Sequence, residues 1–462
     1  MKKVLKFYLA VFISVAMVHC TYTTAKSQTK SEHSIYKKSV PEWTKNLTIY
    51  EVNLRQYSKS GSFKDFEKHL PQLKEMGVGI LWFMPVNPIG VKNRKGTMGS
   101  YYSVSDYLGI NPEHGTLQDF KDMVKKCHDM GFYVIIDWVA NHTAWDNNLI
   151  TSHPEWYKHD STGNIIPPVA DWSDVAGLNY NNPGLHRYMI DAFKFWLKET
   201  GIDGFRCDVA GMVPVEFWNE ARPALDSIKP VFMLAECEEP AYHDKAFDMT
   251  YTWNFHFLAA DIAQGKKTVL SLDTLLLKES KTYPLEAYRM YFTSNHDENT
   301  WAGTAYEKFG GGVKTYAVLT FMLPGMPLIY SGQEAGLNKR LKFFEKDTIE
   351  WKKDEFFDFY KTLIALKKSN KALWNGTYGG KMVRINTTDD KDVFAFYRQK
   401  DGDEVVVILN LTKNSADIKL QNCPVSGTYT DVFRQKQVEI ANNSSFNLKP
   451  WEYIVLEKRG NK

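Results

Sequence analysis

The sequence has no marked excess of charge of either sign. Its 57 lysines and arginines nearly balance 54 aspartates and glutamates, which leaves a formal net charge of +3 over 462 residues. It shows neither a basic stripe of the kind that binds nucleic acid nor an acidic tail. No segment beyond the N-terminus reaches about 18 uninterrupted apolar residues, so we expect no transmembrane helix in the mature chain. A Gly-rich phosphate loop is also missing, which argues against a nucleotide cofactor.

Cysteine is scarce, with five in the chain. Apart from Cys20 they are Cys127, Cys207, Cys237 and Cys423, and their spacing forms no CxxC pair or other metal-binding pattern. Cys207 and Cys237 fall inside apolar segments that have the pattern of core strands. The sequence therefore predicts buried free thiols at these two positions rather than disulfides.

The N-terminus has the pattern of a secretory signal peptide. Three lysines precede an apolar run over residues 7–18, which is too short for a membrane span. Two processing routes stay open: a lipid anchor at Cys20, as in a bacterial lipoprotein, or cleavage after Ala25 to release a soluble protein. We expect a signal peptide at 1–25, a leader or linker at 26–45, and export to the periplasm, the medium or the outer membrane.

From residue 46 to residue 370, segments with strand character alternate with amphipathic helical segments. The expected helices lie at 63–76, 117–130, 185–199 and 355–368, and the expected strands at 48–57, 79–84, 132–138, 204–209, 231–236, 288–293 and 327–330. Alternation of this kind implies parallel βαβ units. About eight repeats over about 330 residues predict an α/β fold, a (β/α)8 TIM barrel with insertions.

Two regions lack this alternation of strands and helices. Residues 143–183, after the third expected strand, are rich in Trp, Asn, Asp and Pro and lack periodicity, so we expect a small subdomain inserted beside the barrel mouth. Over 371–462, short alternating strands such as 393–398, 404–411 and 451–456 are separated by turn residues. This pattern predicts a separate C-terminal antiparallel β-sandwich.

Polar residues stand at the carboxyl ends of four expected barrel strands. These ends read Asp137-Trp-Val-Ala-Asn141-His142, Arg206-Cys-Asp208, Leu-Ala-Glu236 and Asn-His296-Asp297. A TIM barrel builds its active site at this end of its strands. A charged residue there is costly unless it is paired or functional. Four strands that deliver such groups to one mouth predict a catalytic site.

These segments resemble, in the correct order, the four signature regions of glycoside hydrolase family 13, the α-amylase family. Flanking stretches are similar as well: Tyr102 to Tyr107 to the loop after the family's second strand, Gly177-Leu-Asn179 to the end of its subdomain B, and 325–334 to its eighth strand. The resemblance runs from about residue 45 to the C-terminus. It implies a catalytic barrel over 46–370 that includes subdomain B, and a bacterial, secreted, retaining glycosidase.

The resemblance gives each carboxylate a role. It implies that Asp208 is the nucleophile, Glu236 the general acid/base, and Asp297 the group that holds the 2- and 3-hydroxyls of the distorted sugar. Arg206 lies two residues before Asp208, on the same side of the strand, where its charge would keep the nucleophile ionised. Asp137 is expected to orient the site, through Arg206, rather than to touch sugar.

Substrate-binding residues are implied in the same way. Tyr102 is expected to stack under the sugar at the cleavage site. His142 and His296 are expected to donate hydrogen bonds, as neutral imidazoles, to hydroxyls of that sugar, and Arg206 is expected to line the same site.

No cofactor is expected to be required. Many family members bind calcium through an asparagine equivalent to Asn141 and a histidine shortly after the nucleophile. Residues 210–212 supply no histidine here. A calcium site of oxygen ligands that uses Asn141, Asp171 and Asp174 stays open.

The expected reaction is hydrolysis of α-1,4-glucosidic bonds in starch, glycogen or maltooligosaccharides, through a covalent intermediate on Asp208. Several alternatives stay open. In a 4-α-glucanotransferase a sugar hydroxyl would intercept the same intermediate, and a cyclomaltodextrinase or neopullulanase type would differ in substrate. A non-catalytic glucan-binding relative would lack at least one carboxylate, and this chain retains all three.

Overall fold

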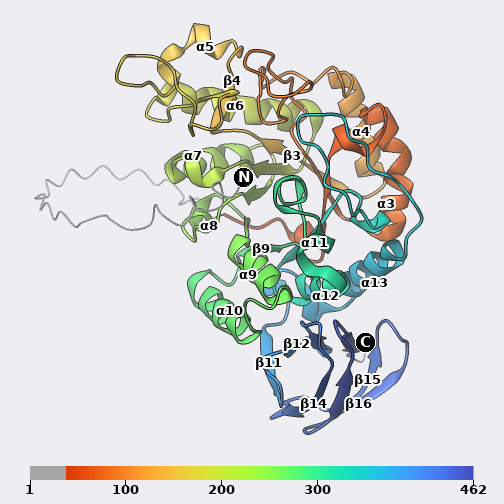
Figure 1. The fold of residues 1–462 in the computed structure, drawn as a ribbon. Coiled ribbons are helices and arrows are strands. Elements are labelled where there is room, and N and C mark those ends of the chain that lie inside the picture. Colours follow the sequence, from red (N-terminus) through yellow and green to blue (C-terminus); the bar gives the residue numbers. More distant parts are fainter. Residues whose placement is uncertain (1–37, 461–462) are drawn as a thin grey trace, which may run out of the picture. The chain divides into compact units, whose positions relative to one another are not determined.

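The computed structural model describes residues 38–460 (Figure 1). The predicted signal peptide, the anchor candidate Cys20 and most of the predicted leader lie outside the described residues. Within the described part of the chain, no helix combines the length and the apolar character that a membrane crossing requires. The four described cysteines form no disulfide, and Cys207 and Cys237 are buried free thiols, as predicted.

Eight parallel strands close into a barrel, which confirms the predicted fold. In chain order they are β1 (Ile49–Val52), β2 (Ile80–Phe83), β3 (Tyr133–Trp138), β6 (Gly204–Cys207), β7 (Phe232–Ala235), β8 (Met249–Tyr251), β9 (Tyr288–Tyr291) and β10 (Met326–Tyr330). The ring closes because β1 pairs in parallel with both β2 and β10.

Two strands differ from their prediction. The strand expected over 48–57 ends at Val52, and the short helix α1 (Leu54–Tyr57) follows. This change has a local cause, because the Asn53 side chain caps α1 by accepting a hydrogen bond from the backbone N–H of Gln56. Strand β8 is not predicted, because three residues are too few to show a period.

Helices cover the outside of the barrel (Figure 1). They are α2 (Phe63–Phe66), α3 (Leu70–Met76), α4 (Leu117–Asp129), α6 (Pro183–Thr200), α7 (Val215–Asp226), α8 (Tyr242–Lys245), α9 (Trp253–Ala263), α10 (Leu270–Thr282), α11 (Ala305–Phe309), α12 (Val313–Met322) and α13 (Glu355–Ser369). A capping box of Thr116 and Asp119 starts α4, and Gly201 in the left-handed region ends α6. The predicted helices are confirmed to within a few residues at α4, α6 and α13.

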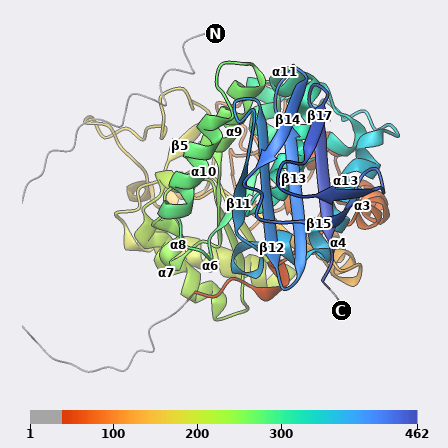
Figure 2. The ribbon, with the colours of Figure 1, turned by 90° about the horizontal axis from the view of Figure 1, so that it is seen from below.

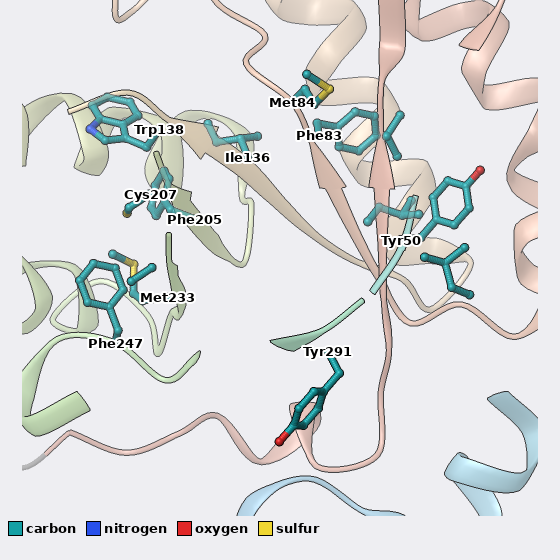
Figure 3. Close-up of a cluster of buried hydrophobic side chains, with 14 of the residues drawn as sticks. Tyr50, Phe83, Met84, Ile136, Trp138, Phe205, Cys207, Met233, Phe247 and Tyr291 are labelled. Atoms are coloured by element: carbon teal, nitrogen blue, oxygen red, sulfur yellow. The ribbon is translucent and has the colours of Figure 1, made fainter. Parts of the chain in front are cut away.

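Strand alternation divides the barrel side chains into two cores. One set points into the barrel and includes Ile49, Ile80, Ile135 and Leu234. The other set points toward the helices, and Figure 3 shows Phe83, Ile136 and Phe205 among its members. Gly204 allows β6 and β7 to approach, because a Cβ there would lie 1.9 Å from the carbonyl oxygen of Phe232.

The segment between β3 and α6 contains little regular structure. It holds β4 (His142–Ala144), α5 (Leu149–Ser152) and β5 (Val175–Gly177). Strands β4 and β5 form a separate antiparallel pair. The absence of periodicity over 143–183 reflects this irregular insert, drawn in yellow in Figure 1.

The C-terminal part is antiparallel, as predicted. Its strands form one hydrogen-bonded sheet (Figure 2), composed of β11 (Met382–Thr387), β12 (Val393–Lys400), β13 (Asp403–Asn410), β14 (Ala416–Gln421), β15 (Gly427–Asp431), β16 (Gln437–Ile440), β17 (Ser445–Leu448) and β18 (Tyr453–Lys458). Ile440 and Leu448 stand on its two edge strands but share one core. The sheet therefore curls around that core until its two ends face each other.

Candidate active site

The inward side of the barrel is apolar at the start of the strands and charged at their carboxyl ends. Residues on one face of a strand are two positions apart. Each charged residue lies two positions after a residue that faces the barrel interior: Glu51 after Ile49, Asp137 after Ile135, Arg206 after Gly204, and Glu236 after Leu234. The strands thus place one arginine and several carboxylates together at one end of the barrel.

Arg206 is the centre of this cluster. Its fully buried guanidinium forms ion pairs with three carboxylates, at 2.9 Å to Asp137, 2.9 Å to Asp208 and 2.8 Å to Glu236. Asp208 and Glu236 therefore lie side by side, as the prediction of a catalytic pair requires. The Asp208 and Glu236 side chains are 9% and 11% exposed, whereas Asp137 is fully buried beneath them.

Three carboxylates share one cation, and the pKa values of Asp208 and Asp137 are raised. Burial raises the pKa of Asp208; Arg206 opposes the shift and Glu236 adds to it. Burial also raises the pKa of Asp137 to about 6, again against the pull of Arg206. Because such groups titrate together, the cluster as a unit holds a proton more readily than separate carboxylates would.

Backbone strain adjoins the pair. Val209, directly after Asp208, has a φ of 35°. This region is unfavourable for a β-branched residue and persists only where the surroundings enforce it. In this conformation the Val209 N–H donates to Glu236 Oε2 at 2.7 Å. The strained turn therefore links the Asp208 strand to the Glu236 carboxylate.

His296 connects Asp297 to the barrel interior. Its Nδ1 contacts Oε1 of the buried Glu51, and its Nε2 lies 3.3 Å from Asp297 Oδ2. The Asp297 side chain is 36% exposed, more than Asp208 or Glu236. The predicted trio is thus distributed over the mouth, with Asp297 on the more open side.

The two predicted histidines differ in charge. Burial lowers the pKa of His142 to about 3, so this imidazole is neutral, the form that the prediction requires. Burial also lowers the pKa of His296, but Asp297 and Glu51 outweigh burial and raise it to about 9. His296 therefore carries a charge at neutral pH, and the prediction of a neutral donor at this position is wrong.

Tyr102 lies at the same mouth. Its hydroxyl donates to Asp137 Oδ2 at 3.1 Å and lies 2.7 Å from His296 Nε2. Its ring stacks on His296 with centroids 5.4 Å apart and on Phe343 with centroids 6.2 Å apart. The structure thus brings this predicted platform residue together with the charged cluster.

Three members of the site are not predicted from the sequence. Trp82 donates its Nε1–H to Asp137 Oδ2 at 3.3 Å, and the Tyr251 hydroxyl accepts from Arg206 Nε at 3.2 Å. Glu51 supports His296 from strand β1. Only Glu51 leaves a signal in the sequence, because it is an acidic residue inside an otherwise apolar strand.

The residues considered for calcium have partners within the chain. The Asn141 side chain contacts His142 Nδ1 at 3.2 Å. The Lys95 ammonium lies 3.0 Å from Asp174 Oδ1 and 2.8 Å from the Asp171 carbonyl oxygen. Among residues 38–460, no group of three or more His, Cys, Asp or Glu side chains could hold a metal ion.

The loop that carries Asp297 has its own buried support. Glu298 accepts from His256 Nε2 at 2.9 Å and forms an ion pair with Lys308. Burial would raise the pKa of Glu298, but His256 and Lys308 outweigh it and lower the pKa to about 2. A carboxylate that stays ionised below the surface therefore anchors the backbone next to Asp297.

Comparison with protein-family models gives two matches. Residues 35–172 and 156–354 match the model described as "Alpha amylase, catalytic domain". Residues 383–455 match the model described as "Maltogenic Amylase, C-terminal domain".

Characterised relatives and solved structures agree with these matches. Alpha-amylase 2 of Dictyoglomus thermophilum is 25% identical over 440 residues, which cover 87% of this chain and 74% of the relative. A cyclomaltodextrinase of Thermoanaerobacter pseudethanolicus is 24% identical over 473 residues, with coverage of 90% and 78%. The crystal structure of a noncanonic maltogenic alpha-amylase from Thermotoga neapolitana superposes with a TM-score of 0.83 at 31% identity, and covers 90% of this chain and 99% of its own.

Proposed function

The chain belongs to the α-amylase family of glycoside hydrolases, and from this premise we propose that it cleaves α-1,4-glucosidic bonds with retention of the anomeric configuration. The observation that carries the proposal is the contact of one buried arginine with both Asp208 and Glu236 at the carboxyl end of the barrel. Two carboxyl groups side by side are what a double displacement requires.

In the first step we assign Asp208 as nucleophile and Glu236 as acid. An Asp208 oxygen attacks the anomeric carbon, the bond to the leaving oxygen breaks, and Glu236 donates its proton to that oxygen. Burial raises the pKa of Asp208 and Glu236 adds to the rise, while Arg206 limits it and so favours the ionised form that attacks. The product of this step is a covalent glycosyl ester on Asp208.

In the second step Glu236 acts as a base. It takes a proton from water, the hydroxyl oxygen bonds to the anomeric carbon, and the Asp208 carboxylate leaves. Two inversions restore the original configuration, and Glu236 regains the proton that it gave in the first step. The enzyme ends in the state in which it began.

The remaining residues hold the sugar. We assign Asp297 to the 2- and 3-hydroxyls, His142 and His296 as donors to hydroxyls, and Tyr102 as the platform under the ring. Arg206, predicted to line the site, is fully buried and holds the carboxylates instead of the sugar. Bonds that tighten in the transition state would lower the barrier. The charge on His296 makes it a stronger donor than a neutral imidazole.

As preferred substrates we propose maltooligosaccharides and cyclomaltodextrins. Starch and glycogen, as longer glucans with the same α-1,4 bonds, come second. The relatives named as cyclomaltodextrinases, a maltogenic alpha-amylase and a neopullulanase support this order. Incubation with maltoheptaose, a cyclodextrin and soluble starch separates the substrates. Products longer than maltoheptaose would assign transfer to a sugar hydroxyl instead of hydrolysis.

Two variants test the assignment of roles. Asp208→Asn removes the nucleophile and Glu236→Gln removes the acid/base, so each is expected to lower kcat on maltoheptaose by about 10³-fold or more. An exposed Glu155→Gln variant serves as the control. Turnover close to that of the wild type in either site variant would contradict the roles assigned to Asp208 and Glu236.

We also propose that the protein is exported and needs no cofactor. The lysine-led apolar run at the N-terminus supports export, with lipidation at Cys20 and release after Ala25 as the two routes. The mass of the mature protein distinguishes them. Lys95 beside Asp171 and Asp174 supports the absence of calcium at that point, and no step above uses a metal.

A further inference from the structure

An exposed tryptophan stands at the rim of the barrel mouth. Trp301 is 55% exposed. It lies in the π-helical turn Glu298–Ala302, directly after Asp297. Exposed apolar residues scattered singly are ordinary, but a contiguous aromatic patch at a concave site marks a binding surface.

Trp301 belongs to such a patch. Its ring lies 5.2 Å from that of Phe343 and 5.8 Å from that of Phe344, by centroids. Phe343 in turn is nearly parallel to Tyr102, with an interplanar angle of 11°. The aromatic rings therefore contact one another in series from Tyr102, next to the charged cluster, out to the exposed Trp301.

The backbone under this patch is fixed. The Asn299 side chain donates to the Lys339 carbonyl oxygen at 3.0 Å and accepts from the Leu341 N–H at 2.9 Å. Thr300 Oγ1 donates to the Leu341 carbonyl oxygen at 2.8 Å. These bonds join the turn that carries Trp301 to the loop that carries Phe343.

A second anchor holds the Phe343 side of the patch. The buried Arg55 guanidinium donates to the Phe343 carbonyl oxygen at 3.1 Å and to the Gly99 carbonyl oxygen at 2.9 Å. A ring on a fixed backbone loses little further freedom when a ligand covers it, so it binds at a lower entropic cost than a ring on a loose loop.

We propose that Trp301, with Phe343 and Phe344, forms a subsite that stacks a glucosyl unit of the glucan beyond the unit held at Tyr102. The inference rests on the proposed function. Flat apolar faces suit the C–H face of a pyranose, whose burial removes apolar surface from water. The subsite lengthens the binding surface on the Asp297 side, so it favours chains of several glucose units over single glucosides.

Two substrates test the subsite in the whole protein. Maltoheptaose can extend beyond the sugar unit at Tyr102, whereas 4-nitrophenyl α-glucoside carries a single sugar. Trp301→Ala is expected to lower kcat/KM for maltoheptaose about tenfold and to leave that for the nitrophenyl glucoside within about twofold. Trp301→Phe should recover most of the loss, because it restores an aromatic face.

The control is Leu285→Ala, which removes a side chain that is 66% exposed from the segment before β9, at the opposite end of the barrel. It should change neither value. An equal loss on both substrates, or no loss on maltoheptaose, would overturn the subsite. A wild-type protein without activity on any glucan would instead overturn the proposed function.

Binding tests the subsite without turnover. In a Glu236→Gln background, calorimetric titration with maltoheptaose should show about tenfold weaker binding when Trp301→Ala is added. Unchanged binding, accompanied by a shift in oligomeric state on size-exclusion chromatography, would assign Trp301 to a protein contact and overturn the proposal.

Discussion

At the residue scale, the site depends on charges that support one another from different strands. Arg206 meets carboxylates from β3, from the end of its own strand and from the end of β7. His296 is held between Glu51 and Asp297. The pKa values of Asp137, Asp208 and His296 depend on burial and on charged neighbours that include residues from other strands.

Glu51 is the residue whose effect is most easily isolated. Its carboxylate helps to raise the pKa of His296 to about 9, together with Asp297, while burial and Arg206 act in the opposite direction. A raised pKa keeps the imidazole protonated up to that pH and lets it lose the proton above. Glu51→Gln should therefore lower this pKa and move the alkaline limb of the kcat/KM profile to lower pH, by about one unit.

The measurement is a pH profile on maltoheptaose. The Tyr102 hydroxyl and the Trp82 ring also face His296, and both remain in the variant. A lower kcat at all pH values with the alkaline limb unmoved would show that Glu51 only supports the fold, and would contradict the account of His296.

At the element scale, the C-terminal sheet packs against the barrel through alternate residues of its strands and through one arginine. Along β13, Val405 and Val407 belong to the core shared with the barrel helices, while Val406 and Ile408 belong to the core of the sheet itself. Arg398 on β12 lies in this contact. Both faces of the central strands are therefore buried, and the sheet cannot separate without exposing apolar surface.

Arg398 contributes to this contact, and its contribution to the free energy of unfolding can be measured. Its guanidinium donates to the carbonyl oxygens of Met322 and Leu323 at 3.0 Å, and to those of Gly380 and Trp374 at 2.9 and 3.1 Å. Arg398→Met should leave these acceptors without donors and lower the free energy of unfolding by about 3 kcal/mol. Chemical denaturation measures it, with the more exposed Arg459→Met as control; a loss below about 0.5 kcal/mol would contradict this role.

At the scale of the whole molecule, the sequence was enough to predict the barrel, its insert and the antiparallel C-terminal part. Long segments such as 117–130 show a clear period, and turn residues separate the later strands. Asp208, Glu236 and Asp297 could be predicted as the catalytic carboxylates because each stands at the carboxyl end of an expected barrel strand, within a segment that resembles a signature region of the α-amylase family.

What could not be predicted depends on contacts across the barrel. Strand β8 is too short to show a period, so Tyr251 went unrecognised. The charge of His296 depends on Glu51, which lies 245 positions away in the chain. The aromatic patch at Trp301 forms only when the loops after β9 and β10 pack together. Sequence patterns reveal local periodicity, but they do not reveal contacts between residues that are distant in the chain.

The central claim is that Asp208 and Glu236 carry out a double displacement. The most direct test is proton NMR of the first sugar released from maltoheptaose, recorded before mutarotation. The account predicts the α-anomer at the new reducing end, because two inversions restore the original configuration. Initial release of the β-anomer would mean a single inversion by water, and would contradict the assignment of Asp208 as a covalent nucleophile.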